Sequence, residues 1–344
     1  MNILALALGT VERAPLPDGI TLAGMDFLAS RARRRLSEVT PESEAAFTTA
    51  MRYYPVARPS QPDAVNRDMP AEFFEYVLGP QRKYSCCLYP GDTTTLEEAE
   101  NYALAETVAH ADISDGQTIL ELGCGWGALS LYLARNFPYA RITAVTASAA
   151  QRDYIESQIA THGLSNLAVL TADMNTFLPH GSFDRIVSVE MFEHMSNWQI
   201  LFERAREWLN EDGRLFLHVF THRNRSYRLD RTDTADWIAH YFFTGGIMPA
   251  FDLPHRFADL LEVEQEWRWS GNEYRRTALD WLDNFDRNVD KIDPIMKEVY
   301  GAEATLWRRR WRLFFLATAG LFGHANGCEW GVGHYRLRPV SGRV

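Results

Sequence analysis

The sequence predicts an α/β fold built on a mostly parallel, doubly wound sheet. Short β-branched strands alternate with longer helical stretches between about residues 97 and 220, which is typical of βαβ units. A glycine-rich turn follows the first of these strands, and a helical pattern begins directly after it. Ligands of such sheets bind at the carboxyl ends of the strands, so we expect the functional residues there.

The individual elements follow from hydrophobic periodicity and from turn residues. The predicted strands are residues 118–122, 142–146, 167–171, 183–189 and 214–220, with late strands near 263–269 and 333–339. The predicted helices of the same region are residues 96–108, 127–136, 149–162 and 198–209.

Composition limits the possible partners. A net charge of -10 argues against nucleic acid, because binding phosphates requires a basic surface. The longest apolar stretch, residues 313–322, has about half of the ~20 residues that a membrane-spanning helix needs. The cysteines form no Cys-x-x-Cys pair and fit thiols of a reducing compartment: Cys86, Cys87, Cys124 and Cys328. We therefore expect a cytoplasmic protein with at most peripheral membrane contact.

The N-terminal region is predicted to be a helical extension followed by a connector. The apolar run at residues 1–8 lacks the preceding basic residue of a secretory signal, so we expect an opening helix turn. Four prolines favour the connector: Pro55, Pro59, Pro62 and Pro70. A basic run could contact an anionic membrane, but a solvated helix face is the favoured interpretation: Arg31, Arg33, Arg34 and Arg35.

The glycine turn reads Glu121-Leu122-Gly123-Cys124-Gly125-Trp126-Gly127. Glycine lets the backbone turn sharply and approach a ligand without a Cβ in the way. The spacing is the usual methyltransferase form. The next strand ends in Thr146-Ala147-Ser148 without the acid that holds the ribose in nicotinamide folds, and this missing acid departs from most methyltransferases as well. The turn therefore favours S-adenosylmethionine over a nicotinamide, and a purely structural strand-to-helix turn stays open at this point.

Several separated motifs from about residue 70 to the C-terminus form one series. They are Tyr84-Ser85-Cys86-Cys87, Thr94-Thr95-Leu96-Glu97-Glu98-Ala99, Glu121 to Gly127, Val145-Thr146-Ala147-Ser148 with Gln151, Ala172-Asp173-Met174, Phe183-Asp184-Arg185-Ile186 and Phe192-Glu193-His194-Met195. This series resembles the cyclopropane-fatty-acid synthase family of S-adenosylmethionine-dependent methyltransferases. The ending, from Phe322 to Trp330, looks like that of its coclaurine-type N-methyltransferase branch.

The resemblance implies a class I, Rossmann-like methyltransferase fold with S-adenosylmethionine as cofactor and S-adenosylhomocysteine as product. The residues that it implies for the cofactor are Tyr84, Ser85, Gly123, Gly125, Thr146, Ser148, Gln151, Asp173 and Met174. Among these, Tyr84 would contact the methionine part, and Asp173 would accept the adenine amino group.

The resemblance also implies a reacting centre just after the fourth strand. Its candidates are Glu190, Glu193, His194, His218, Tyr274 and Cys86. In the lipid synthases of the family bicarbonate is the base, and its ligands resemble Cys86, Glu193, His218 and Tyr274 here. Methyl transfer needs an aligned acceptor and a group that takes up the proton shed by the product.

Glu190 favours a different acceptor. The lipid synthases usually carry glycine at this position, whereas the coclaurine-type enzymes carry glutamate. A carboxylate there would attract a protonated amine and help to deprotonate it. We therefore predict methylation of a small hydrophobic amine ahead of methylation or cyclopropanation of an unsaturated phospholipid acyl chain. A non-catalytic protein that binds the cofactor or a lipid is the alternative of another class.

These inferences divide the chain into four parts. Residues 1–75 are the N-terminal helical extension and connector, and residues 76–225 are the Rossmann-like core that binds S-adenosylmethionine. Residues 226–325 form a mainly helical, aromatic-rich acceptor lid with a late core strand, and residues 326–344 hold the C-terminal strand of the core sheet.

Overall fold

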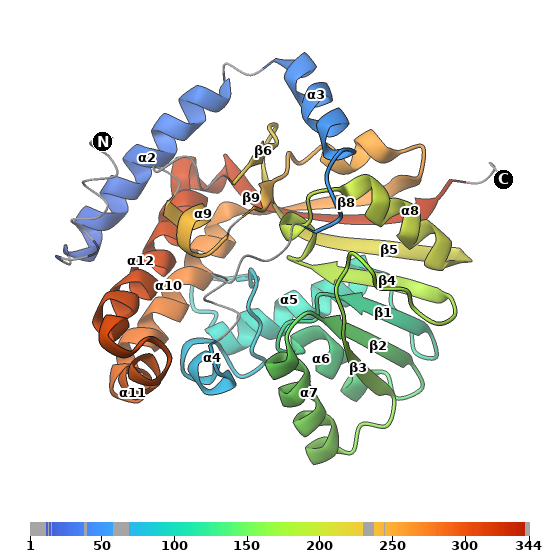
Figure 1. Ribbon diagram of the computed structural model, residues 1–344, viewed down its shortest axis with the longest axis horizontal. Coiled ribbons are helices and arrows are strands. Elements are labelled where there is room, and N and C mark those ends of the chain that lie inside the picture. The colour runs from blue at the N-terminus through green and yellow to red at the C-terminus, as the bar shows by residue number, and fades with distance from the viewer. Residues whose placement is uncertain are drawn as a thin grey trace.

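The centre of the molecule is a seven-stranded sheet with the order β3-β2-β1-β4-β5-β9-β8 (Figure 1). The computed structural model describes residues 16–37, 40–57, 69–229, 237–243 and 245–340, together with the single positions Glu12 and Ala14. The strands are β1 (Thr118–Leu122), β2 (Arg141–Thr146), β3 (Leu167–Thr171), β4 (Phe183–Val189), β5 (Leu209–His222), β8 (Leu261–Ser270) and β9 (Trp330–Pro339). Strands β1 to β5 run parallel, and β9 pairs antiparallel with both β5 and β8. The predicted mostly parallel, doubly wound sheet is confirmed.

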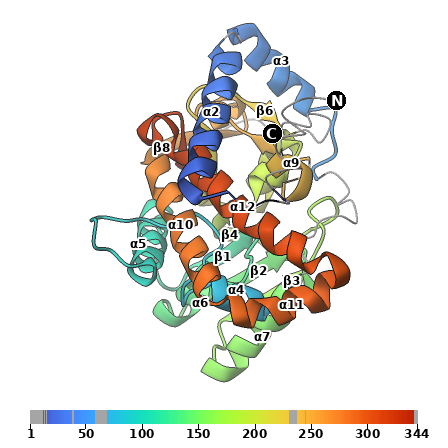
Figure 2. The same ribbon diagram turned by 90° about the vertical axis from the view of Figure 1, so that its left-hand side faces the viewer.

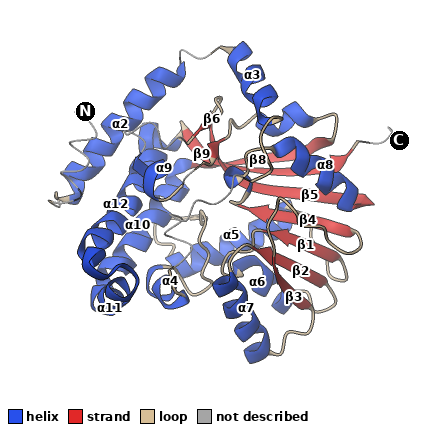
Figure 3. Ribbon diagram, in the orientation of Figure 1, coloured by secondary structure: helices blue, strands red, loops and turns tan. Residues whose placement is uncertain are grey.

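Helices cover the sheet and form a separate cap at one end of it (Figure 3). Those of the core are α5 (Leu96–His110), α6 (Ala128–Asn136), α7 (Ala149–His162) and α8 (Trp198–Trp208). Those of the cap are α2 (Asp18–Ser37), α4 (Ala71–Val77), α9 (Trp237–Tyr241), α10 (Gly271–Arg287), α11 (Val289–Tyr300) and α12 (Ala304–Gly323). Figure 2 shows α2, α10, α11 and α12 stacked in front of the sheet, and α12 packs against α2, α10 and α11. None of the helices in the described ranges is both long and apolar enough to cross a membrane.

Local sequence signals fix the helices that carry functional side chains. Helix α5 begins with a capping box, in which Thr95 and Glu98 each accept the other's backbone N–H through their side chains. Helix α10 begins after Ser270, whose hydroxyl accepts the backbone N–H of Asn272. Because α10 starts there, Tyr274 lies in its first turns and is buried against the core.

The predicted elements agree closely with the structure, and the differences lie at strand and helix ends. Strand β5 extends over residues 209–222 instead of 214–220, because it pairs with β4 on one side and with β9 on the other. A two-stranded sheet of β6 (Tyr227–Arg228) and β7 (Ile247–Met248) was not predicted, and a short helix α3 (Pro41–Met51) lies within the N-terminal residues 1–75. The opening helix turn expected at residues 1–8, and Pro59 and Pro62 of the connector, lie outside the described residues.

Candidate active site

A cavity of about 1460 Å³ lies at the carboxyl ends of the parallel strands, between the sheet and the helical cap. The strand order reverses between β1 and β4, and such a switch point is where open α/β sheets bind their ligands. Residues of the strand ends form one wall, among them Gly123, Thr146, Asp173 and Glu190. Cap residues such as Phe314 of α12 form the opposite wall.

The glycine turn follows β1 in a conformation that its glycines make possible. Gly123, Gly125 and Gly127 have φ angles of 80°, 53° and 81°, in the left-handed region that favours glycine. A Cβ at Gly123 would lie 2.5 Å from Cγ of Met191. The N–H group of Gly123 donates to the carbonyl of Val145 at 2.9 Å, so the turn is fixed to the end of β2. Backbone therefore lies directly against the cavity at this point.

The end of β2 presents hydroxyl and amide groups to the cavity. The hydroxyl of Thr146 donates to Oε1 of Gln151 and accepts the N–H of Ser148 at 3.1 Å. Ser148 caps α7 by accepting the N–H of Gln151. Beside them, Glu121 accepts a hydrogen bond from the Ser130 hydroxyl, and burial raises the pKa of Glu121 to about 7.

Asp173 and Met174 follow β3, and both line the cavity. Asp173 is exposed, and its Oδ1 accepts both the backbone and the side-chain N–H of Asn175, at 2.9 and 3.0 Å. Asn175 in turn accepts the backbone N–H of Ala57 at 3.0 Å. These hydrogen bonds thus hold the segment after α3 beside Asp173, the residue that the sequence suggests for adenine.

The segment before α5 brings Tyr84 and Ser85 into the cavity wall. Tyr84 packs against Phe74 and Trp281, with ring centroids 5.1 and 5.5 Å away. The Ser85 hydroxyl accepts a hydrogen bond from Nζ of Lys83 at 2.6 Å. Lys83 is 2% exposed and was missed in the sequence, where its place directly before the Tyr-Ser motif was the available signal.

Glu190 is a carboxylate of the cavity wall with several hydrogen-bond partners. Its Oε1 accepts the backbone N–H of Cys86 at 2.9 Å and lies 3.2 Å from Nε2 of His218. Its Oε2 accepts the hydroxyl of Tyr274 at 2.7 Å. Burial raises the pKa of Glu190, and the positive charge of Lys83 and these hydrogen bonds oppose that rise. The structure thus brings four of the six predicted catalytic residues together.

The backbone at Glu190 is left-handed, with φ of 48°. The Glu190 N–H donates to the His218 carbonyl at 2.8 Å, which extends the ladder between β4 and β5 by one step before the chain turns. A residue with a side chain costs about 1–3 kcal/mol in such a conformation, whereas glycine adopts it freely.

Cys86 contacts Glu190 through its backbone N–H. Its thiol is buried, donates to the Cys87 carbonyl at 3.4 Å, and is not part of the cavity lining in the described structure. Burial and the charge of Glu190 raise the pKa of this thiol well above its usual value. The cysteine side chain is therefore not presented to a ligand.

Glu193 and His194 differ in exposure although they are neighbours in the short 3-10 helix η2 (Phe192–His194). Glu193 is fully buried, its Oε1 accepts the N–H of Phe220 at 2.7 Å, and no described residue hydrogen-bonds its Oε2. Burial and the charge of Glu190 raise its pKa well above the usual value. His194 lines the cavity and stacks on Phe243, with ring centroids 4.1 Å apart. Only His194 of this pair faces the cavity.

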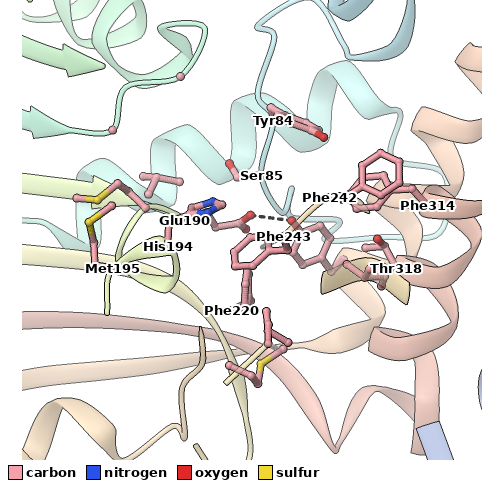
Figure 4. Close-up of a pocket in the computed structure, with 18 of the residues that line it drawn as sticks. Tyr84, Ser85, Glu190, His194, Met195, Phe220, Phe242, Phe243, Phe314 and Thr318 are labelled. Carbon is pink, nitrogen blue, oxygen red and sulfur yellow. Dashed lines mark hydrogen bonds between the residues drawn. The ribbon is translucent and has the colours of Figure 1, made fainter. Parts of the chain in front are cut away.

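Aromatic rings form most of the wall opposite the strand ends. Figure 4 shows Glu190 and His194 on one side of the cavity, with Phe242 and Phe314 on the other. The Phe242 and Phe314 rings stack with centroids 4.5 Å apart, and Tyr274 stacks on Phe322 at 4.4 Å. This part of the cavity therefore combines the Glu190 carboxylate with an apolar, aromatic enclosure.

A left-handed glycine turn at the switch point, an open strand-end cavity and a parallel sheet closed by an antiparallel pair define a class I S-adenosylmethionine-dependent methyltransferase. The model of the mycolic acid cyclopropane synthetase family matches residues 59–326. The chain belongs to this family.

Individual relatives agree with that assignment. The chain is 38% identical over 272 residues to (S)-coclaurine N-methyltransferase of Thalictrum flavum subsp. glaucum, covering 78% of this chain and 75% of the relative. It is 29% identical over 220 residues to the cyclopropane-fatty-acyl-phospholipid synthase of Escherichia coli strain K12, covering 63% and 54%. The crystal structure of coclaurine N-methyltransferase bound to N-methylheliamine and S-adenosylhomocysteine superposes with a TM-score of 0.92 at 33% identity, covering 98% of this chain and 100% of that one.

The protein is thus an S-adenosylmethionine-dependent methyltransferase of the cyclopropane synthetase and coclaurine N-methyltransferase type. The cavity fits the cofactor, because the open glycine turn leaves room at Gly125, where an added Cβ would meet no atom within 4 Å. When bound, S-adenosylmethionine supplies an electrophilic methyl group on a sulfonium.

Proposed function

We propose that the protein transfers the methyl group of S-adenosylmethionine to the nitrogen of a small hydrophobic amine. The observation that carries this proposal is the carboxylate of Glu190, fixed in the cavity wall by Cys86, His218 and Tyr274. An amine is protonated near neutral pH and is not a nucleophile in that form. Glu190 attracts the ammonium group and accepts its proton, which leaves the lone pair that attacks the methyl group.

The backbone of Glu190 supports this role. Glycine would hold the same left-handed turn without strain, so the glutamate costs about 1–3 kcal/mol relative to glycine at this position. Strain of this kind is typical of functional sites. The side chain at this position therefore has a use that the fold alone does not require.

The surroundings of Glu190 fit a cationic, apolar acceptor. Phe220, Phe243 and Phe314 present aromatic rings to the cavity, and such rings attract a cation while excluding water from the apolar part of the ligand. His194 lies in the same wall and is the second group that we assign to proton transfer. We assign Tyr84, Ser85, Gly123, Gly125, Thr146, Ser148, Gln151, Asp173 and Met174 to cofactor binding.

The relatives support the same acceptor class. The two relatives at 38% and 37% identity are both (S)-coclaurine N-methyltransferases, and the similar crystal structure holds N-methylheliamine. The lipid alternative is less well supported, because three of the groups expected to bind bicarbonate, those of Cys86, His218 and Tyr274, already have Glu190 as their hydrogen-bond partner. Bicarbonate could bind these groups only by displacing Glu190 from them.

An acceptor panel tests the proposal. Purified protein is incubated with S-adenosylmethionine carrying a labelled methyl group and with heliamine, (S)-coclaurine or vesicles of a phospholipid with a cis-unsaturated chain. We expect labelled N-methyl product from at least one amine and no labelled lipid. Labelled acyl chains without labelled amine would replace the proposal by the lipid alternative. Cofactor binding without any methylated product would favour a non-catalytic role.

A further inference from the structure

Three buried histidines connect Glu190 with a glutamate at the protein surface. Nε2 of His218 lies 3.2 Å from Oε1 of Glu190, and Nδ1 of His218 lies 2.8 Å from Nε2 of His334. Nδ1 of His334 lies 2.7 Å from Nδ1 of His110, and Nε2 of His110 lies 3.2 Å from Oε1 of Glu106. Every ring nitrogen of the three histidines thus has a hydrogen-bond partner. We call this series, from Glu190 through His218, His334 and His110 to Glu106, the histidine chain.

Three separate elements build this chain. His218 on β5 and His334 on β9 are directly paired across the antiparallel ladder. His110 and Glu106 lie one turn apart on α5, which carries them to the far side of His334. Only Glu190 of these residues lines the cavity in the described structure. The chain therefore leaves the active site through the core instead of through the cavity mouth.

The middle of the chain is closed to water. His218 and His334 are 0% exposed, whereas the side chain of Glu106 is 44% exposed. Trp267 stacks on His110 with a centroid distance of 3.8 Å, and Trp269 lies 4.3 Å from the His334 ring. Because no water reaches the inner rings, protons can move there only along the hydrogen bonds.

Neutral imidazole has one donor and one acceptor nitrogen, so the chain has two complete hydrogen-bond arrangements. In the outward arrangement Glu190 is protonated and donates to His218, the rings donate in turn toward the surface, and His110 donates to ionised Glu106. In the inward arrangement every bond is reversed: Glu106 is protonated and donates to His110, and His218 donates to ionised Glu190. One step of four protons along four bonds interconverts the arrangements, and no ring changes its net charge.

We propose that this histidine chain shares one proton between Glu190 and Glu106, so that a surface residue outside the cavity sets the charge of the active-site carboxylate. When a cationic acceptor binds beside Glu190, the inward arrangement is favoured and the negative charge moves from Glu106 to Glu190. After methyl transfer, the proton that Glu190 took from the acceptor leaves to water through the cavity mouth together with the product. The proton held by Glu106 then returns along the hydrogen bonds to Glu190. Glu106 is thus a positioning residue that acts through the three histidines. The proton sharing follows from the geometry, and only its role in turnover rests on the proposed function, the methylation of an amine.

The electrostatic surroundings suit such a chain. Burial, more than the charge of Lys83, keeps the pKa of His218 well below its usual value, and burial also lowers the pKa of His334 and His110. The rings are therefore neutral, as both arrangements require. The other titratable or charged groups that act on the chain are Lys83, Cys86, Glu193, His194, Tyr274 and Arg336.

Glu106→Gln tests the inference without any methyl acceptor. A glutamine amide can donate to His110 and cannot be ionised, so it permits the inward arrangement that ionised Glu106 opposes. Nitrogen NMR of labelled histidines should show Nδ1–H at His218 and Nε2–H at His110 in the wild type, with both tautomers reversed in the variant. The apparent pKa of Glu190, followed by infrared difference spectroscopy with Glu190→Gln as the reference, should fall by about one unit.

Glu97→Gln is the matched control, because it removes one charge from an exposed position of the same helix outside the chain. It should leave the histidine tautomers and the titration of Glu190 unchanged. His334→Gln interrupts the chain directly, and in it the titration of Glu190 should no longer respond to Glu106→Gln. Unchanged tautomers and an unchanged Glu190 titration in Glu106→Gln would overturn the inference. They would leave the proposed amine methylation untouched, since the acceptor panel tests that separately.

Discussion

The two halves of the cavity are built in different ways. The half that we propose for the cofactor, here called the cofactor half, lies at the ends of β1 to β3 and consists of backbone and short polar side chains, such as Gly123, Thr146 and Asp173. The half that we propose for the acceptor, here called the acceptor half, consists of long side chains from the cap and from the ends of β4 and β5. These side chains are held by contacts between residues far apart in sequence. Tyr274 and Glu190, for example, are 84 positions apart. The proposed cofactor site thus depends on local structure at the strand ends, whereas the proposed acceptor site depends on the packing of the cap against the core.

Glu190→Gly should have the largest effect of the four changes, and it should slow methyl transfer without weakening binding in the cofactor half. The change removes the carboxylate that takes up the acceptor proton, and glycine adopts the left-handed backbone conformation of this position without strain. We expect kcat for the amine to fall by about 10²–10⁴-fold, the usual contribution of a general base, with unchanged binding of S-adenosylhomocysteine. Steady-state kinetics and calorimetry measure the two quantities. Amine turnover at the wild-type rate would remove Glu190 from the mechanism.

Gly123→Ala should affect the opposite half. The added Cβ would collide with Met191, and alanine is strained at a φ of 80°. We expect the Kd of S-adenosylhomocysteine to rise by about tenfold or more, since about 1–3 kcal/mol of strain corresponds to that change. Gly181→Ala is the control, because it has the same φ of 80° and no atom within 4 Å of the added Cβ. Equal losses in the two variants would mean that general strain, and not the cofactor turn, explains the effect.

Tyr274→Phe should change the pH dependence more than the maximal rate. The tyrosine hydroxyl donates to Oε2 of Glu190 and lowers the pKa of that carboxyl, so its removal raises the pKa. Glu190 acts as a base only when ionised, and the acidic limb of the kcat profile should therefore move to higher pH by about one unit. An acidic limb that stays in place or moves to lower pH would contradict the assignment of Glu190 as the base.

Asp173→Asn should have the smallest effect of the four changes. Asp173 is exposed, and its Oδ1 is already engaged by Asn175. Loss of one hydrogen bond from a charged acceptor to adenine would raise the KM for S-adenosylmethionine by about tenfold, with kcat unchanged. A fall in kcat at saturating cofactor would show that Asp173 also supports the acceptor half through the Asn175–Ala57 contact.

Sequence patterns were sufficient for the core elements because these depend on local interactions. Strands β1, β3 and β4 and helix α7 have the predicted bounds. The pattern could not predict how far β5 extends, since its C-terminal end pairs with β9, more than a hundred residues later, and its N-terminal end pairs with β4. Nor could it distinguish Glu193 from His194 in exposure, because only the packing of η2 decides which of these neighbours faces the cavity.

Local sequence signals alone indicate the proposed cofactor half: three alternate glycines after a short strand, a hydroxyl cluster after the next strand and an acid after the third. Those signals are local, because left-handed turns and helix caps depend on a few consecutive residues. Only the tertiary structure decided that Cys86 contributes its backbone, that Lys83 is buried beside the site and that three histidines reach from Glu190 to Glu106. The physical reason is that these groups meet across paired strands and a packed helix, where burial and distance, not sequence spacing, set their partners and their charge.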